Sequence, residues 1–284
     1  MSFKSFYFLH VPRTGGKFVK KYLIEPIYKD LESKGIEIIQ NPIFREDNRL
    51  NDHVGWNSKI SPDTYVFSIF REPISWACSY FTQEIYWRHG ATDPKSGISK
   101  DSIEIKKEEL IDFYQTYRFM HNYQSQNFIL TALQGSMMKW EAISFEKTGA
   151  EINKDFVEKR LNRVNLLVKN KDLNNPNKII EQISSDMGLE IDYRVSDSID
   201  MSYNGNTASK SLYDSLNNSE RLFLEDAFSI DLEMYNKDIF WSTEWYNLYM
   251  EIILGMILGI VVIGFALFAS AKDFDNNQWK NKRY

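Results

Sequence analysis

The 284-residue sequence is poor in cysteine, and its only one, Cys78, cannot form an internal disulfide or supply a cysteine-rich metal site. It also has little excess charge, because 34 Lys and Arg residues oppose 39 Asp and Glu residues and leave a net charge of −5. A general nucleic-acid binder needs a basic surface, so this balance argues against a nucleic-acid partner, and any anion site has to be local. The N-terminus lacks the apolar stretch of a secretory leader, because its apolar run covers only residues 6–9.

One long apolar run is present near the other end. Residues 252–270 carry no charge, and these 19 residues are about the length that crosses a hydrocarbon core of ~30 Å as a helix. We therefore expect a main domain over 1–247, a single-pass transmembrane helix over 248–271 and a short charged tail over 272–284. Gly255 and Gly259 form a GxxxG pair that would let two such helices associate as a homodimer.

The orientation of this expected anchor rests on two conflicting arguments. Lys and Arg residues follow the span, while Glu244 and Glu251 precede it, so the positive-inside tendency places the tail in the cytoplasm. A span this close to the C-terminus without a leader is instead typical of a tail-anchored protein with a cytoplasmic main domain. We favour the second interpretation.

Within residues 1–247, strand-like and helix-like segments alternate. This alternation predicts an α/β fold with a mainly parallel sheet covered on both faces. A stretch crowded with Asn, Ser and Gly predicts a long loop over 197–211. The expected strands are 3–9, 36–39, 64–70 and 165–168, and the expected helices are 16–33, 73–88, 109–133, 154–162, 176–187 and 219–228.

The segment FYFLHVPRTGGKFVKKYL orders a strand, a turn and a helix. Glycines let backbone N–H groups approach a phosphate, and the helix N-terminus adds partial positive charge, so the segment predicts an anion site. Its expected members are Pro12, Arg13, Thr14, Gly15, Gly16 and Lys17. The Walker A pattern fails twice, because Val11 replaces its first glycine and Phe18 replaces its magnesium-binding hydroxyl residue. Phosphate binding without a metal is therefore favoured over an ATPase or GTPase.

The HVPRTGG motif resembles the 5′-phosphosulfate motif of the carbohydrate sulfotransferases, the family of heparan sulfate 2-O-sulfotransferase, whose typical form is HIPKTGGTS. The segment TYVFSIFREPISWACSYF is similar to the family's 3′-phosphate motif, with Arg71 at the strand end and Ser79 eight positions later. NYQSQNFILTALQG and NGNTASKSLYDSL match later family motifs in order, and the second contains Lys210, a candidate nucleotide contact. The resemblance covers about residues 3–235.

The resemblance implies a three-layer fold like that of the P-loop NTPases. It also implies transfer of a sulfuryl group from 3′-phosphoadenosine 5′-phosphosulfate (PAPS) to a hydroxyl of a glycan or glycolipid, with no metal. His53 in NDHVGW aligns with a catalytic histidine of the 2-O type and is the candidate base, although the preceding family histidine is missing. Arg13 and Lys17 are the other candidate catalytic residues.

Two departures from the family pattern keep alternatives open. Arg13 replaces the usual lysine, and Lys17 replaces a hydroxyl residue and either takes over the lysine's role or only covers the helix surface. The alternatives are a P-loop kinase or nucleotide hydrolase, and a catalytically inactive, membrane-tethered protein that binds nucleotide or glycan. The candidate contacts for the glycan acceptor are the aromatic and basic residues Trp56, Tyr80, Trp87 and Arg88.

Overall fold

The computed structural model describes residues 3–15, 19–39, 55–57, 59–129, 152–196, 199 and 207–237, together with 255, 256, 258 and 260. The chain divides into two compact units, Met1–Trp241 and Ser242–Tyr284. Among the described residues, no helix has the length and apolarity that a membrane crossing requires. Apart from its four described residues, the expected span 248–271 lies outside this part of the chain, so the anchor remains a prediction.

The first unit has an α/β fold built on a parallel sheet, as expected. Four strands are described, β1 (Ser5–Leu9), β2 (Glu37–Ile38), β3 (Thr64–Phe70) and β4 (Leu166–Lys169), and they pair in parallel in the order β2-β1-β3-β4. The helices of this unit are η1 (Lys20–Ile24), α2 (Glu25–Ser33), α3 (Pro73–Arg88), η2 (Lys100–Ser102), α4 (Lys107–Thr116), η3 (Arg118–Met120), α5 (Tyr123–Ile129), α7 (Lys154–Leu161), η5 (Asn170–Asn174), α8 (Pro176–Met187), α9 (Thr207–Ser215), α10 (Asn218–Ala227) and α11 (Ser229–Tyr235).

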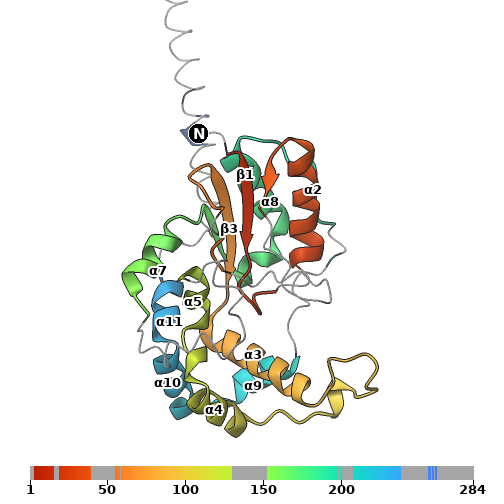
Figure 1. The fold of residues 1–284 in the computed structure, drawn as a ribbon, viewed down its shortest axis with the longest axis vertical. Coiled ribbons are helices and arrows are strands. Elements are labelled where there is room, and N and C mark those ends of the chain that lie inside the picture. Colours follow the sequence, from red (N-terminus) through yellow and green to blue (C-terminus); the bar gives the residue numbers. More distant parts are fainter. Residues whose placement is uncertain are drawn as a thin grey trace, which may run out of the picture. The chain divides into compact units, whose positions relative to one another are not determined.

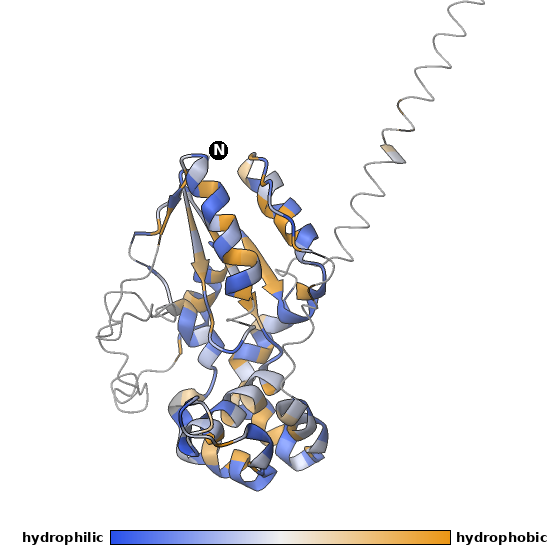
Figure 2. Ribbon diagram, turned by 90° about the vertical axis from the view of Figure 1, so that its right-hand side faces the viewer, coloured by the Kyte–Doolittle hydropathy of each residue, from blue (hydrophilic) through white to orange (hydrophobic). Residues whose placement is uncertain are grey.

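Helices cover both faces of the sheet, because side chains alternate along each strand. In β1, Phe6 and Phe8 belong to a core shared with α2 and α8, whereas Tyr7 and Leu9 belong to a core shared with α5, α7 and α11. Figure 1 shows these two helix groups on opposite sides of the strands, and Figure 2 shows apolar residues concentrated along the strands and on parts of each helix. A third core joins α3, α4, α9 and α10 beyond the carboxyl ends of the strands (Figure 1).

The helix expected at 16–33 is not uniform, and Pro26 explains the change. Proline has no N–H to donate to the carbonyl of Tyr22, four residues earlier. The chain forms a π-helical turn there, in which the Glu25 N–H donates to the carbonyl of Lys20, and the regular helix α2 follows. The Tyr22 carbonyl accepts a hydrogen bond from the Tyr193 hydroxyl instead (2.7 Å).

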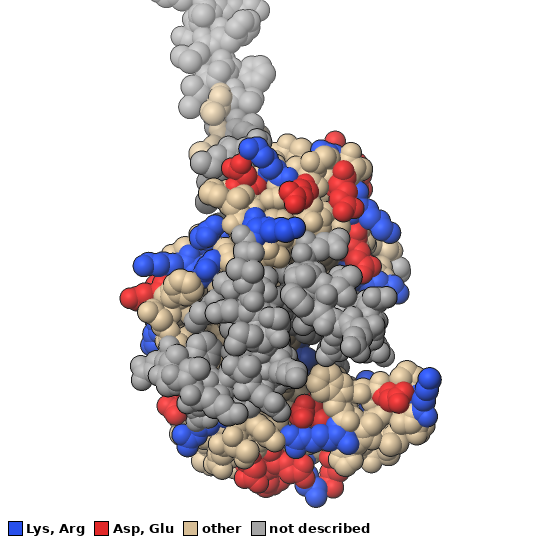
Figure 3. Space-filling view, viewed as in Figure 1, with Lys and Arg blue, Asp and Glu red and all other residues tan. Residues whose placement is uncertain are grey.

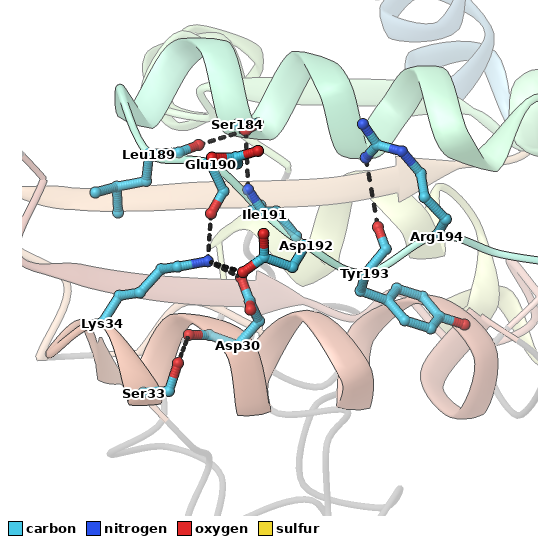
Figure 4. A network of polar contacts seen from close by, with 10 residues as sticks. All are labelled: Asp30, Ser33, Lys34, Ser184, Leu189, Glu190, Ile191, Asp192, Tyr193 and Arg194. Carbon is cyan, nitrogen blue, oxygen red and sulfur yellow. Dashed lines mark hydrogen bonds and ion pairs between the residues drawn. The ribbon is translucent and has the colours of Figure 1, made fainter.

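The segment that follows α8 is bound to α2 by a polar network (Figure 4). Lys34 Nζ donates to Asp30 Oδ2 (2.7 Å), to Asp192 Oδ2 (3.0 Å) and to the carbonyl of Glu190. The Ser184 hydroxyl donates to the carbonyl of Leu189 and accepts from the Ile191 N–H (3.2 Å). These contacts attach the segment after α8 to the end of α2, on the face of the sheet that both helices cover.

The expected helix 109–133 is divided, because α4 ends at Thr116 and α5 begins at Tyr123, directly after Asn122, which has a positive φ of 53°. The Asn122 side chain accepts from the N–H groups of Ile230 (2.9 Å) and Asp231 (3.0 Å) at the start of α11. In return, the Asp231 carboxylate accepts from the N–H groups of Gln124 (3.1 Å) and Ser125 (2.7 Å) at the start of α5. Each helix thus caps the other. Asp231 is fully buried, and burial raises its pKa to about 7.

The expected loop 197–211 is wrong at its end, because α9 begins at Thr207. Ser209 and Leu212 of α9 are buried, and Leu212 belongs to the core that α9 shares with α3. This packing stabilises a helix that the polar local composition did not predict.

Candidate anion site

The turn that follows β1 has an unusual backbone. Arg13 has a φ of 65° and Gly15 a φ of 109°, both in the left-handed region. For a non-glycine residue such as Arg13 this conformation costs roughly 1–2 kcal/mol, so the surrounding contacts have to hold it. At Gly15 the φ of 109° favours glycine, and a Cβ atom would lie 3.1 Å from Cγ2 of Val19 and 3.3 Å from Nδ2 of Asn170, so a larger residue would also have to displace these side chains. We call residues 11–15 the β1 turn.

Every carbonyl of the β1 turn accepts a hydrogen bond. The donors, from Val11 to Gly15 in order, are the Thr14 hydroxyl (2.7 Å), the Trp76 indole N–H (2.6 Å), the Arg71 guanidinium (3.2 Å), the Asn170 amide (2.7 Å) and the Val19 N–H (3.1 Å). In a trans peptide the N–H points away from the carbonyl. The N–H groups of Arg13, Thr14 and Gly15 therefore point away from these donors, and they donate to no acceptor in the part of the chain that the structure describes. Successive backbone N–H groups without an acceptor in a turn are the arrangement from which anion-binding nests are built.

Arg71 lies where β3 ends and is fixed on three sides. Its backbone N–H donates to Gln124 Oε1 (2.9 Å), and Gln124 Nε2 donates to the Arg71 carbonyl (2.9 Å). The guanidinium donates from Nε to the Ser75 hydroxyl (3.0 Å) and from Nη1 to the Arg13 carbonyl (3.2 Å). Because β1 and β3 are adjacent and parallel, their carboxyl ends meet, and this brings Arg71 against the β1 turn.

The Arg13 guanidinium is held by two uncharged acceptors on α3. Nη2 donates to the Ser79 hydroxyl and Nη1 to the Gln83 side-chain carbonyl, both at 3.2 Å. Ser79 and Gln83 are one helical turn apart, so they present their oxygens on the same face of α3. Nε of Arg13 is buried and has no hydrogen-bond partner among the described residues. We call Ser79 and Gln83 the Arg13 clamp.

Neither arginine forms an ion pair within the described ranges. The neighbouring Glu72 carboxylate caps α3 by accepting from the N–H groups of Ile74 (3.1 Å) and Ser75 (2.6 Å). Burial, followed by repulsion from Arg71, lowers the pKa of Arg13 to about 10, and burial also lowers the pKa of Arg71. Both side chains remain cationic at neutral pH, so the site presents two positive charges that lack a described counter-ion.

The structure brings most of the described candidate residues together. Pro12, Arg13, Thr14 and Gly15 belong to the β1 turn, the Arg71 guanidinium donates to the Arg13 carbonyl, and the Ser79 hydroxyl accepts from the Arg13 guanidinium. Lys210 is exposed on α9, and no hydrogen bond or ion pair is described between it and these residues. Gly16, Lys17 and His53 lie outside the described residues, so their predicted roles remain predictions.

Sequence reasoning did not single out several residues that shape the site, among them Gln83, Trp76 and Asn170. Gln83 had a usable signal, because it follows Ser79 by one helical turn. Asn170 also had one, since it comes directly after β4, whose carboxyl end lies at the same sheet edge. Nothing in the sequence pattern pointed to Trp76 as a donor to the turn.

Most of the residues suggested as contacts for the sugar acceptor are engaged in contacts of their own. Trp56 is buried beneath the guanidinium groups of Arg160 and Arg163, and Tyr80 stacks on Trp76 with 5.2 Å between ring centroids. In a separate part of α3, Trp87 is 54% exposed, and Arg88 pairs with Glu84 (3.1 Å). Of these four, only Trp87 presents an open aromatic surface.

Comparison of the chain with known proteins finds no matching family model, no matching curated sequence and no matching solved structure.

Proposed function

We propose that this protein is a sulfotransferase that uses PAPS as donor and a carbohydrate hydroxyl, in a glycan or glycolipid, as acceptor. The observation that carries this proposal is the β1 turn itself. Three backbone N–H groups and two guanidinium groups without a described carboxylate partner meet at one edge of a parallel sheet. Such a site suits a ligand with several negative charges and needs no metal to hold it.

The 5′-phosphosulfate and the 3′-phosphate of the donor would each bind to a different part of this site. The N–H groups of the β1 turn and Arg13 would bind the 5′-phosphosulfate, while Arg71 and Ser79 would bind the 3′-phosphate. Arg13 bonds to Ser79, and Arg71 bonds to the Arg13 carbonyl, so the two halves are close enough to contact one nucleotide. The order of strand, turn and helix beside β3 also supports a fold of the P-loop NTPase type.

In the proposed transfer, the acceptor oxygen bonds to sulfur as the bridging S–O bond breaks, and the electron pair of that bond leaves with adenosine 3′,5′-bisphosphate. Arg13 and the N–H groups of the turn stabilise the negative charge that develops on the bridging oxygen. Arg13 keeps its proton and acts only electrostatically. His53 is the proposed acceptor of the hydroxyl proton, and Lys17 is a second proposed cation near the leaving group.

A second candidate is a membrane-tethered protein that binds the nucleotide without turning it over. Arg13 favours it, because a guanidinium cannot give a proton to a leaving group. Both candidates include the C-terminal helix 248–271 as a membrane anchor.

The test uses the full chain in neutral detergent. Binding of adenosine 3′,5′-bisphosphate is compared with binding of 5′-AMP, and label transfer from sulfur-labelled PAPS is followed on a panel of glycans and glycolipids with and without a chelator. We expect the bisphosphate to bind more tightly, Arg71→Ala to weaken that preference at least tenfold, and the exposed control Arg194→Ala to leave it unchanged. Equal affinity for the two nucleotides would refute the donor assignment, and binding without transfer would select the second candidate.

A further inference from the structure

Two arginines share one buried indole on the α7 side of the sheet. The Arg160 guanidinium carbon lies 4.7 Å from the centroid of the Trp56 ring, and that of Arg163 lies 5.1 Å from it. Trp56 is only 3% exposed, so it is a fixed support for both side chains. In Figure 3, Lys and Arg side chains gather over α7 on the left of the view.

These two charges lack a described counter-ion. No ion pair of Arg160 or Arg163 occurs among the residues that the structure describes. Glu158, on the same helix as Arg160, pairs with Lys237, and Asp63, between Pro62 and Thr64 of the hollow beside Arg163, pairs with Lys4 (2.9 Å). Burial lowers the pKa of Arg160, and repulsion from Arg163 lowers it further. An anion placed here would relieve that repulsion.

Beside Arg163 the surface forms a hollow of about 240 Å³, whose polar lining includes Ser61, Thr64, Asn162 and Asn165. Asn165 is held in place by the strand: its side-chain oxygen accepts from the Val66 N–H (2.8 Å), and its own N–H donates to the Val66 carbonyl (2.8 Å). The side-chain nitrogen of Asn165 is therefore the atom that is available to donate a hydrogen bond to another molecule. A water occupies about 30 Å³ of liquid, so the hollow has room for a phosphate-sized group.

The hollow and the β1 turn are at opposite edges of the sheet. Thr64, at the start of β3, lines the hollow, and Arg71 follows seven positions later. At ~3.3 Å per residue this separation is about 23 Å, too far for the two phosphates of one nucleotide. The hollow is therefore independent of the proposed donor site.

We propose that Arg163 and Asn165, with Arg160 beside them on Trp56, bind the phosphate or sulfate group of a second molecule in this hollow. A guanidinium and an amide N–H₂ are both donors only, and they match a tetrahedral oxyanion. Two sources carry this chemistry, a free phosphate or sulfate ester and the headgroup of an acidic lipid.

The test measures binding to the full chain in phosphatidylcholine-containing micelles at constant ionic strength. One series adds inorganic phosphate against a chloride control, and the other replaces part of the phosphatidylcholine with phosphatidic acid. Binding is read as a ligand-dependent rise in melting temperature. Both series contain saturating adenosine 3′,5′-bisphosphate, because inorganic phosphate would otherwise also bind the proposed donor site. Wild type is expected to respond in at least one series, and the responding series identifies the source.

The variants Arg163→Gln and Arg160→Gln should weaken that response at least tenfold in apparent affinity. Lys159→Ala removes one charge from an exposed position of the same helix and serves as the matched control, with an expected change of less than threefold. Adenosine 3′,5′-bisphosphate binding should be unaffected in all three variants, which separates this site from the donor site. The proposal is overturned if neither series raises the melting temperature above its control, or if Lys159→Ala weakens binding as much as Arg163→Gln.

Discussion

Gln83→Glu would change the charge of the group that holds Arg13 while keeping its shape. The Gln83 oxygen lies 3.2 Å from Arg13 Nη1, and a carboxylate oxygen would take the same place. Two unit charges at that distance attract by about 5 kcal/mol at an effective dielectric constant of ~20, an upper figure for a partly solvated pair. The substitution would therefore pair a cation that now has only uncharged acceptors.

The expected result has two opposite parts. Pairing offsets the cost of burying Arg13, so the melting temperature of the unliganded protein should rise and the pKa of Arg13 should move back toward its ordinary value. The same pairing removes the charge that an anion would meet. The lost charge-assisted hydrogen bond, about 1.5–3 kcal/mol, weakens binding of adenosine 3′,5′-bisphosphate by roughly 10- to 150-fold.

Calorimetric titration and thermal unfolding of the same samples provide the assay, with Gln83→Leu as the companion variant. Leucine removes an acceptor without adding charge, so it should lower the melting temperature and weaken nucleotide binding by roughly tenfold or less. The reasoning fails if Gln83→Glu is stabilised and still binds the bisphosphate as tightly as wild type, because the uncharged clamp would then not be what keeps Arg13 available.

Three further substitutions test other parts of the structure. Arg13→Ala should reduce sulfuryl transfer on the order of 10²- to 10³-fold in a label-transfer assay, and unchanged turnover would contradict its role at the bridging oxygen. Gly15→Ala, at a φ of 109°, should lower the free energy of unfolding by about 1–3 kcal/mol in a urea titration and abolish bisphosphate binding, and wild-type values would contradict the tight turn. Asp231, with an ordinary pKa of 3.8 and a folded pKa of about 7, keeps a proton that the unfolded chain releases, so its contribution to stability is full below about pH 4 and is lost as the pH rises toward 7. Asp231→Asn should reduce the change of the urea unfolding midpoint with pH between about 4 and 7. If the midpoint of the variant still changes with pH as in wild type, another group causes the dependence.

The elements that were predicted correctly are those whose signal is local. The strands of the sheet carry apolar runs, and the parallel arrangement follows from their alternation with helices. The errors occur where distant residues decide the structure. α5 begins only after Asn122, whose side chain caps α11, more than 100 positions away, and α9 forms in a polar stretch because it packs on α3.

In the candidate site, too, local signals were predictable and most contacts between distant residues were not. Arg13, Arg71 and Ser79 were predicted to act together from the resemblance of their two motifs to those of the sulfotransferases, and the spacing of Ser79 two helical turns beyond Arg71 agreed with it. The structure adds the reason, since β1 and β3 are adjacent and parallel and their carboxyl ends meet. The contacts that shape the turn were not predictable in this way. Asn170 and Trp76 donate to backbone carbonyls, and an interaction with a backbone atom places no demand on the identity of the residue that it supports.

Three of the five hydrogen bonds to the carbonyls of the β1 turn come from distant residues, on α3, at the end of β3 and directly after β4. Within the HVPRTGG motif, Gly15 and the Thr14 hydroxyl are local contributions, but the conformation of residues 11–15 otherwise depends on contacts from residues distant in the sequence. Grafting these seven residues onto another strand-to-helix junction would transfer the glycines but not the scaffold that orients the peptide planes. An isolated copy of the motif in an unrelated protein is for that reason poor grounds for assigning it an affinity for nucleotides.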